Sequence, residues 1–188
     1  MIEIRRIGSE ADPLLPPLLA IYGEAFPPAE RRSEAQLLRL IACEPRMAFN
    51  ALLLDGVPVG LLAYWAFDGF HYLEHLAVRH DLRCRHIGSE VLDWIEANLP
   101  GLRLLEAEPA CPSGNASADD VDYELASRRI AYYGRHGYRV LERSYVQRSY
   151  SHDADACPLW ILGSAPDAEL DRHIATIKRE AYLRPLSL

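Results

Sequence analysis

Basic side chains are concentrated in one short segment of the chain, residues 79–89. Five of its first eight residues are Arg or His, although the whole protein has a formal net charge of −7. The segment leads into a helix that we predict over residues 89–98, and a helix N-terminus presents unpaired N–H groups and partial positive charge. Gly88 would allow an anion to approach the backbone closely. These features favour binding of a diphosphate-bearing cofactor, and a solvent-exposed basic loop capped by Ser89 is an equally good interpretation.

Three glutamates in predicted strands are candidates for acid–base chemistry. Glu74 lies in an otherwise apolar or aromatic strand, where period-two alternation puts it on one face with Leu76 and Val78. Glu106 and Glu108 share a face of a later strand. An unpaired buried carboxylate is costly, so each of the three requires a partner, solvent or a function. A salt bridge to an arginine, or exposure at a strand end, would explain each of them without catalysis.

Turn residues and hydrophobic periodicity define the elements that must position these groups. Asp55-Gly56 predicts a tight turn between two strands, because Asp-Gly readily adopts positive φ angles. Ser33 is a predicted N-cap, and Gly137 is a natural left-handed cap after a helix. We predict strands over residues 1–7, 47–54, 57–67, 70–78, 102–107, 138–147 and 159–162, and helices over residues 16–26, 34–44, 89–98, 120–135 and 167–182.

This order of elements predicts an α+β, or mixed α/β, fold in one domain over residues 1–165. The remaining residues, 166–188, are predicted to form a helical tail that packs on the domain or contributes to a homodimer interface. The chain has 188 residues, of which 49% are hydrophobic and 25% charged, and this composition is typical of a globular protein.

Composition and charge exclude several classes of function. The net charge of −7 disfavours nucleic acid and anionic membranes as partners. No apolar run approaches the ~20 residues of a membrane-spanning helix, and the charged N-terminus lacks the pattern of a secretory signal, so we expect a cytoplasmic location. The four cysteines form no C-x-x-C pair, and His71 and His75 would lie about 13 Å apart on a strand, so we expect no metal site.

Residues 76–88 resemble the acyl-CoA-binding motif of the GNAT superfamily of N-acetyltransferases. In that motif a strand is followed by Arg or Gln, two residues, Gly, one residue, and Gly or Ala. The corresponding positions here are Arg83, His86 and Gly88. His86 replaces the usual first glycine, and its side chain could obstruct a pyrophosphate or donate a hydrogen bond to it.

A second segment, residues 132–138, resembles the family's Phe/Tyr-Tyr-x-x-x-Gly-Phe/Tyr signature. Shorter segments that begin at Phe26, Glu74, Leu105 and Tyr145 are similar to a bacterial subgroup whose acceptor is undefined. The resemblance implies the GNAT fold, with a central, twisted, mostly antiparallel sheet of about seven strands, flanking helices and a C-terminal helix.

The resemblance also implies transfer of an acetyl group from acetyl-CoA, as co-substrate, to a primary amine of a small molecule or peptide by direct attack. The amine must lose a proton, since an alkyl ammonium has a pKa of ~10.4, and the departing thiolate must gain one. Glu74 and Glu106 are equal candidates for the general base. The resemblance places Tyr133 near the cofactor sulfur as general acid, and phenol and thiol pKa values of ~10 and ~8.5 permit that transfer.

The same resemblance implies which residues bind each substrate. Predicted contacts to acetyl-CoA come from Leu76, Ala77, Val78, Arg83, Cys84, Arg85, His86, Ile87, Gly88 and Ser89, and backbone N–H groups of the first three would polarise the carbonyl. Predicted contacts to the acceptor come from Phe26, Glu30, Arg31, Glu108 and Tyr145. These groups are aromatic, acidic and basic, so the acceptor stays open, and the negative net charge slightly favours a cationic one.

Two other functions remain open from the sequence. A GNAT-fold protein could bind acyl-CoA without turning it over, as a sensor or interaction module, and His86 favours this alternative. The basic segment could also bind an anion or RNA, although the acidic character of the chain argues against it. Coenzyme A release in the presence of amines would separate an enzyme from both alternatives.

Overall fold

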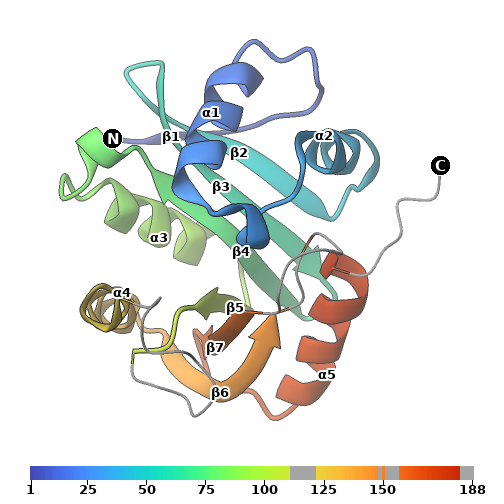
Figure 1. The fold of residues 1–188 in the computed structure, drawn as a ribbon, viewed down its shortest axis with the longest axis vertical. Coiled ribbons are helices and arrows are strands. Elements are labelled where there is room, and N and C mark those ends of the chain that lie inside the picture. The colour runs from blue at the N-terminus through green and yellow to red at the C-terminus, as the bar shows by residue number, and fades with distance from the viewer. Residues whose placement is uncertain (111–121, 148–149, 151–156, 183–188) are drawn as a thin grey trace.

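The computed structural model describes residues 1–110, 122–147, 150 and 157–182 of the chain (Figure 1). Within these ranges the centre of the fold is one seven-stranded sheet in the order β1-β2-β3-β4-β5-β7-β6. β4 and β5 are parallel to each other, and the other neighbouring strands are antiparallel. The strands are β1 (Glu3–Arg6), β2 (Met47–Leu54), β3 (Val57–Phe67), β4 (Phe70–Val78), β5 (Leu102–Ala107), β6 (Arg139–Gln147) and β7 (Cys157–Gly163).

Five α-helices and three shorter helical segments complete the described part of the fold. The α-helices are α1 (Leu15–Ala25), α2 (Glu34–Cys43), α3 (Ile87–Asn98), α4 (Tyr123–Arg135) and α5 (Leu170–Thr176). The shorter segments are the 3₁₀ turns η1 (Pro28–Glu30) and η2 (His80–Leu82), and the π-helical η3 (Ile177–Tyr182), which continues α5. None of the helices in these ranges is both long and apolar enough to cross a membrane.

The predicted mixture of helices and strands is confirmed, including the bounds of the meander formed by β2, β3 and β4. Asp55 and Gly56 both adopt positive φ angles, +52° and +77°, as a primed two-residue turn requires. At the start of α2, the Ser33 hydroxyl accepts a hydrogen bond from the Gln36 N–H, and the Gln36 side chain accepts one from the Ser33 N–H. This capping box satisfies two free donors at that helix end.

Four helices begin at residues other than those predicted. α1 begins at Leu15 rather than residue 16, and α5 begins at Leu170 rather than residue 167. α3 starts at Ile87 rather than Ser89, because His86 adopts a left-handed conformation that turns the chain into the helix earlier. α4 starts at Tyr123, and the Asp122 carboxylate accepts a hydrogen bond from the Leu125 N–H as its N-cap. The sequence pattern could not fix the starts of α3 and α4, because both depend on local backbone geometry.

Helices cover both faces of the sheet (Figure 1). α1, α2 and α5 with η3 pack on one face, where Leu18, Leu37 and Ile177 are buried. α3 and α4 pack on the other face, where Val91 and Ile95 are buried. A residue on the central strands therefore points into one of two separate layers.

A β-bulge in β4 reverses the alternation of side chains after Glu74. The ladder between β3 and β4 skips this residue, which has no partner in β3. Leu76 and Val78 pack in the layer under α3 and α4, whereas the Glu74 carboxylate contacts Trp65 on the opposite face. The prediction that Glu74 shares a face with Leu76 and Val78 is therefore wrong, because period-two alternation fails across a bulge.

β4 and β5 are paired over only part of their lengths. Their parallel register ends where Leu73 lies opposite Leu105. Beyond that point β4 continues to Val78 paired with β3, and Glu106 of β5 pairs with β7. In the described residues, this part of β4 has no strand partner on its β5 side, and the chain leads from its end through η2 to the start of α3.

Candidate active site

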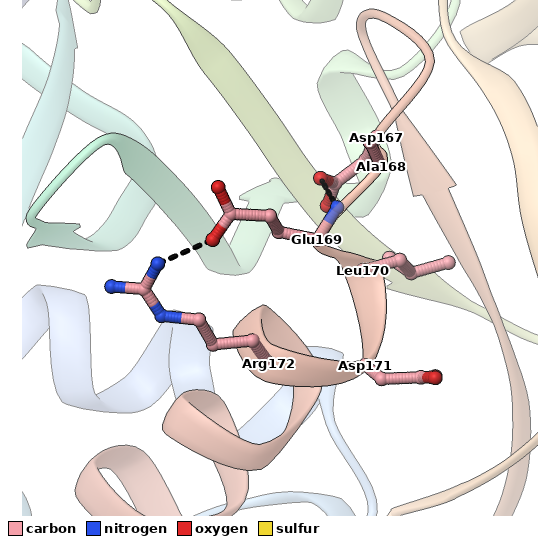
Figure 2. A pocket seen from close by; sticks show the side chains of 6 residues that line it. All are labelled: Asp167, Ala168, Glu169, Leu170, Asp171 and Arg172. Carbon is pink, nitrogen blue, oxygen red and sulfur yellow. Dashed lines mark hydrogen bonds and ion pairs between the residues drawn. The ribbon is translucent and has the colours of Figure 1, made fainter.

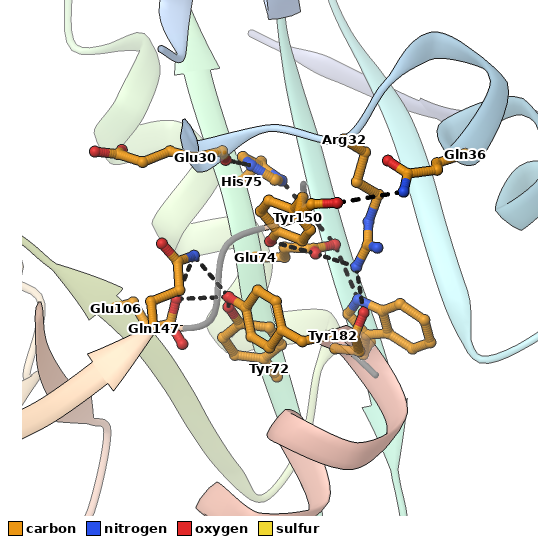
Figure 3. Close-up of polar contacts among 12 residues, drawn as sticks. Glu30, Arg32, Gln36, Tyr72, Glu74, His75, Glu106, Gln147, Tyr150 and Tyr182 are labelled. Atoms are coloured by element: carbon orange, nitrogen blue, oxygen red, sulfur yellow. Dashed lines mark hydrogen bonds and ion pairs between the residues drawn. The ribbon is translucent and has the colours of Figure 1, made fainter. Parts of the chain in front are cut away.

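Glu106, near the end of β5, lies in a buried polar cluster (Figure 3). Its Oε2 accepts hydrogen bonds from the Tyr182 hydroxyl at 2.7 Å and from Gln147 Nε2 at 3.1 Å. Its Oε1 is buried and has no hydrogen-bond partner among the described residues. Burial raises the pKa of Glu106 to about 7, although hydrogen bonds from neighbouring tyrosines partly offset this effect. The carboxyl group can therefore bind or release a proton near neutral pH.

Tyrosine and amide groups surround this carboxyl group. The Tyr72 and Tyr182 hydroxyl oxygens are 2.5 Å apart. The Tyr145 hydroxyl lies beside Glu106 and lowers its pKa, and Gln147 Oε1 is buried with no hydrogen-bond partner within the described ranges. Burial raises the pKa values of Tyr72, Tyr145 and Tyr182 well above their ordinary range, so all three are neutral phenols. The unpartnered oxygens of Glu106 and Gln147 can accept hydrogen bonds from a ligand.

Glu74 occupies a different environment on the same face (Figure 3). Its Oε1 accepts hydrogen bonds from Arg32 Nη2 at 2.6 Å and from the Tyr150 hydroxyl at 2.7 Å, and its Oε2 accepts one from Trp65 Nε1 at 2.9 Å. The side chains of Glu74 and Arg32 are only 1% and 7% exposed. Burial alone would raise the pKa of Glu74, but the Arg32 guanidinium and the other donors lower it below its ordinary value. Glu74 is therefore an ionised anchor that holds the segment before α2 on β4.

The connection between α1 and α2 packs on β4 beside Glu74. The His75 Nε2 donates a hydrogen bond to the Glu30 carbonyl at 3.0 Å, and the His75 ring packs against the Phe26 ring with 4.4 Å between centroids. Burial lowers the pKa of His75, so its imidazole is neutral. Arg31 extends toward α1, where its Nη1 would lie 2.8 Å from a Cβ at Gly23. These contacts place Phe26 and Glu30 over the sheet and direct the Arg31 guanidinium toward α1.

A group of carboxylates lies around Cys157 at the start of β7. The Cys157 thiol donates a weak hydrogen bond to Glu30 Oε1 at 3.9 Å. Burial and the charge of Glu108 raise the pKa of Glu30, and Glu108 itself forms an ion pair with Arg129 of α4. Burial and the charges of Glu30, Glu108 and Glu106 raise the pKa of Cys157 to about 11. The structure therefore brings together three of the sequence-predicted glutamates, and Cys157 remains a protonated thiol.

The predicted acyl-CoA segment runs from the end of β4 to the start of α3. Arg83 Nε donates a hydrogen bond to the Val78 carbonyl at 3.4 Å. His86 precedes α3 without a side-chain cap, which leaves the first N–H groups of the helix available. A Cβ at Gly88 would come within 2.7 Å of the Tyr132 hydroxyl, so α4 packs closely on this glycine. Of the predicted contacts, Arg83, Cys84, Arg85 and His86 are exposed, Leu76, Val78, Gly88 and Ser89 are half-buried, and Ala77 and Ile87 are buried.

His86 and Cys84 have positive φ angles, +62° and +63°. A side chain in this left-handed conformation costs about 1–2 kcal/mol. This cost gives a physical reason for glycine at the position of His86 in the acyl-CoA motif.

Tyr133 of α4 lies in the opposite layer from Glu106. Its ring packs against the Tyr132 and Tyr138 rings, with centroids 5.4 Å and 5.9 Å away, in the layer under α3 and α4. Burial raises the pKa of Tyr133, and the nearby Arg129 offsets this only in part. Tyr133 is therefore a neutral phenol that can donate a proton from one side of the sheet, while Glu106 faces the other side.

A separate hollow of about 410 Å³ lies at the start of α5 (Figure 2). Six consecutive residues, 167–172, line it, and two of them, Glu169 and Arg172, form an exposed ion pair. The sheet contributes no group to this hollow. The cluster around Glu106 is therefore the better candidate for an active site.

Comparison with protein families agrees with both sequence motifs. Residues 15–138 match the model of the acetyltransferase (GNAT) family. The protein is thus an acyltransferase that uses acetyl-CoA as its acyl donor. The chain belongs to the GNAT family, which confirms the predicted resemblance.

Solved structures with this fold have divergent sequences. A Bacteroides thetaiotaomicron protein described as a GNAT-family acetyltransferase has a TM-score of 0.84 and 24% identity, over 96% of this chain and 98% of that one. An aminoglycoside 6'-N-acetyltransferase complexed with coenzyme A has a TM-score of 0.56 and 16% identity, over 88% and 98%. An Elizabethkingia anophelis GNAT acetyltransferase with acetyl-CoA bound has a TM-score of 0.52 and 12% identity, over 86% and 96%. No curated protein matches the chain. At these identities the structural similarity establishes the fold.

The residues around the start of α3 fit the acyl donor of the family. The uncapped N–H groups of α3 and the exposed side chains of Arg83 and Arg85 can bind a diphosphate. The unpaired side of β4 offers further backbone groups to an extended ligand. In the part of the chain that the structure describes, no group of His, Cys, Asp or Glu side chains is arranged to hold a metal ion.

The glutamates could be identified from the sequence, but the residues that bind them could not. Tyr182 is 76 residues from Glu106 along the chain, and Arg32 is 42 residues from Glu74. The available signal was that a buried glutamate requires a partner. That signal indicated the need for donors such as Arg32 and Tyr182, but it could not identify them.

Proposed function

We propose that the protein transfers the acetyl group of acetyl-CoA to a primary amine of a small molecule or peptide by direct attack, with Glu106 as the general base. The observation that carries this proposal is the buried Glu106 Oε1, which no described residue engages in a hydrogen bond. A carboxyl group with a pKa of about 7 can accept a proton from the attacking amine at neutral pH. The unpartnered Oε1 of Gln147 supports the same assignment, because it can orient an amine N–H group beside Glu106.

Glu106 is a better candidate for the base than Glu74, although the sequence alone made the two equal candidates. Arg32, Tyr150 and Trp65 already donate hydrogen bonds to both oxygens of Glu74. Protonation of Glu74 would leave the Arg32 charge buried without its partner, which is strongly unfavourable. The proposal therefore gives Glu74 a structural role.

The acyl donor is assigned to the segment from β4 to α3. When bound, acetyl-CoA supplies an acyl group that is activated as a thioester. Arg83, Arg85 and the N–H groups of residues 87–89 would bind its diphosphate, with Cys84 and His86 alongside, and the backbone N–H groups of residues 76–78 would polarise the carbonyl. Tyr133 is the proposed general acid, because burial keeps its phenol protonated.

The acceptor is assigned to the face of the sheet under α1, α2 and α5. Glu30 and Glu108 lie near Glu106 around Cys157, and Arg129 is the cation paired with Glu108. This excess of carboxylates favours an acceptor that carries positive charge, and the aminoglycoside acetyltransferase among the structural neighbours is consistent with that class. Phe26 and Tyr145 would supply apolar contacts to the same acceptor.

An acceptor screen tests the proposal. Purified protein is incubated with acetyl-CoA and a panel of amino acids, polyamines, aminoglycosides and peptides, and released coenzyme A is measured with a thiol reagent. We expect release with at least one cationic amine and a much lower rate for Glu106→Gln. Binding of acetyl-CoA without turnover on any amine would instead support a non-catalytic acyl-CoA sensor.

A further inference from the structure

The C-terminal helical segment ends inside the candidate active site (Figure 3). Ile177 and Ala181 of η3 are buried against the sheet, and the Tyr182 hydroxyl donates a hydrogen bond to Glu106 Oε2 at 2.7 Å. The family match ends at residue 138, well before this segment. The contact is therefore a feature of this chain that the family match does not supply.

The hydrogen atoms around Tyr182 can be assigned from its partners. Tyr182 uses its single hydroxyl hydrogen for Glu106. Gln147 Nε2 donates to the Tyr182 oxygen at 2.8 Å, and the Tyr72 hydroxyl, 2.5 Å away, must then also donate to it. Two donors thus polarise the Tyr182 hydroxyl toward the carboxylate, and such an arrangement stabilises the ionised form of Glu106.

Other contacts fix Tyr182 in place. Arg32 Nη2 donates a hydrogen bond to the Ala181 carbonyl at 2.6 Å, and the Tyr182 ring lies 4.9 Å from the Tyr150 ring between centroids. The same Arg32 forms the buried ion pair with Glu74. The end of η3 is therefore held by the Arg32–Glu74 ion pair that also holds the segment before α2.

We infer that Tyr182 is a positioning residue for the proposed general base: it holds Glu106 through Oε2, leaves Oε1 free for the acceptor amine, and favours the ionised carboxylate. This inference rests on the proposed function of Glu106. Among the residues that the structure describes, the groups that face Glu106 are Tyr72 and Glu74 from β4, Tyr145 and Gln147 from β6, Cys157 from β7, and Tyr182 from η3. Because burial and the Glu74 charge both raise the pKa of Glu106, loss of the Tyr182 donor should raise it further.

The first test is a direct titration of Glu106 that does not require turnover. Protein labelled with ¹³C at the glutamate side-chain carboxyl carbon is titrated by NMR, and Glu106→Gln identifies the signal. We expect Tyr182→Phe to move the titration midpoint upward by about one pH unit. Tyr64→Phe is the matched control, since Tyr64 is a partly buried tyrosine packed in the opposite layer, and it should leave the midpoint unchanged.

The second test is the pH profile of kcat/KM. Tyr182→Phe should move the acidic limb upward by the same amount, with most of the activity recovered at higher pH. Should Tyr182→Phe fail to fold, Tyr72→Phe removes one of the donors to Tyr182 and should cause a smaller shift in the same direction.

An unchanged or lowered midpoint in Tyr182→Phe would overturn the inference, as would a uniform loss of activity with no shift of the acidic limb. An NMR shift without a kinetic shift would instead overturn the assignment of Glu106 as the base. The two failures are therefore distinguishable.

Discussion

Removal of the Arg32 guanidinium should strongly destabilise the protein. Arg32→Met keeps much of the side-chain volume but leaves Glu74, with 1% of its side chain exposed, without its cationic partner at 2.6 Å. Breaking a buried ion pair from one side typically costs about 3–5 kcal/mol, because the remaining charge is buried without compensation. Two donors to Glu74, Trp65 and Tyr150, remain, so we expect the lower part of that range, about 3 kcal/mol.

The assay is the free energy of unfolding from urea denaturation for wild type, Arg32→Met, Glu74→Gln and the double variant. The free energy of unfolding of the double variant should fall by much less than the sum of the decreases in the two single variants, since the double variant leaves no unpaired charge. Arg128→Met is the control, because Arg128 pairs with Glu124 at the surface, where the two side chains are 74% and 77% exposed. Arg128→Met should lower the free energy of unfolding by less than about 0.5 kcal/mol.

The difference in stability between the wild type and Arg32→Met should depend on pH in a definite direction. The pKa of Glu74 is lowered in the folded wild type, so the pair's contribution is present above the ordinary value of 4.5 and is lost as the pH falls through the lower folded value. In Arg32→Met, burial should raise the pKa of Glu74 instead, and protonation removes the penalty. The stability gap should therefore narrow in acid. A loss below about 1 kcal/mol at neutral pH, or additive losses in the double variant, would refute the buried-anchor interpretation.

Two further predictions concern the donor side of the site. Tyr133→Phe should lower kcat by about 100-fold with little change in the Kd for acetyl-CoA, because it removes the proposed acid but no binding group; unchanged turnover in the thiol-release assay would remove Tyr133 from the mechanism. Arg83→Ala should weaken acetyl-CoA binding by roughly tenfold in isothermal titration calorimetry, because a charge-assisted contact to phosphate is lost. An unchanged Kd would show that the diphosphate lies elsewhere.

Most of the fold could be predicted because local signals and the global pattern agree. Asp55 and Gly56 specify their turn by backbone conformation alone, and Ser33 caps α2 through a residue three positions away. The bulge at Glu74 carries no such local signal. Its single extra residue changes which layer receives Leu76 and Val78, so it altered the predicted surroundings of Glu74 without altering the bounds of β4.

The candidate site could be predicted only in part. Glu74 and Glu106 were both identifiable as carboxylates in apolar strands, yet their different roles depend on partners from distant segments. The charge of Arg32 keeps Glu74 ionised. Burial among neutral tyrosines instead raises the pKa of Glu106 to about 7. The tail was expected to pack or to dimerise, and nothing in its helical spacing indicated that Tyr182 would reach Glu106.

The most direct test of Glu106 as the general base is the turnover of Glu106→Gln beside Glu74→Gln, with an amine that the wild type acetylates. We expect Glu106→Gln to lower kcat by about 100- to 10,000-fold and to leave acetyl-CoA binding unchanged. The kcat/KM of the wild type should rise with pH through about 7 as Glu106 ionises. Near-normal turnover in Glu106→Gln, with turnover abolished in a folded Glu74→Gln, would contradict the assignment of Glu106 as the general base.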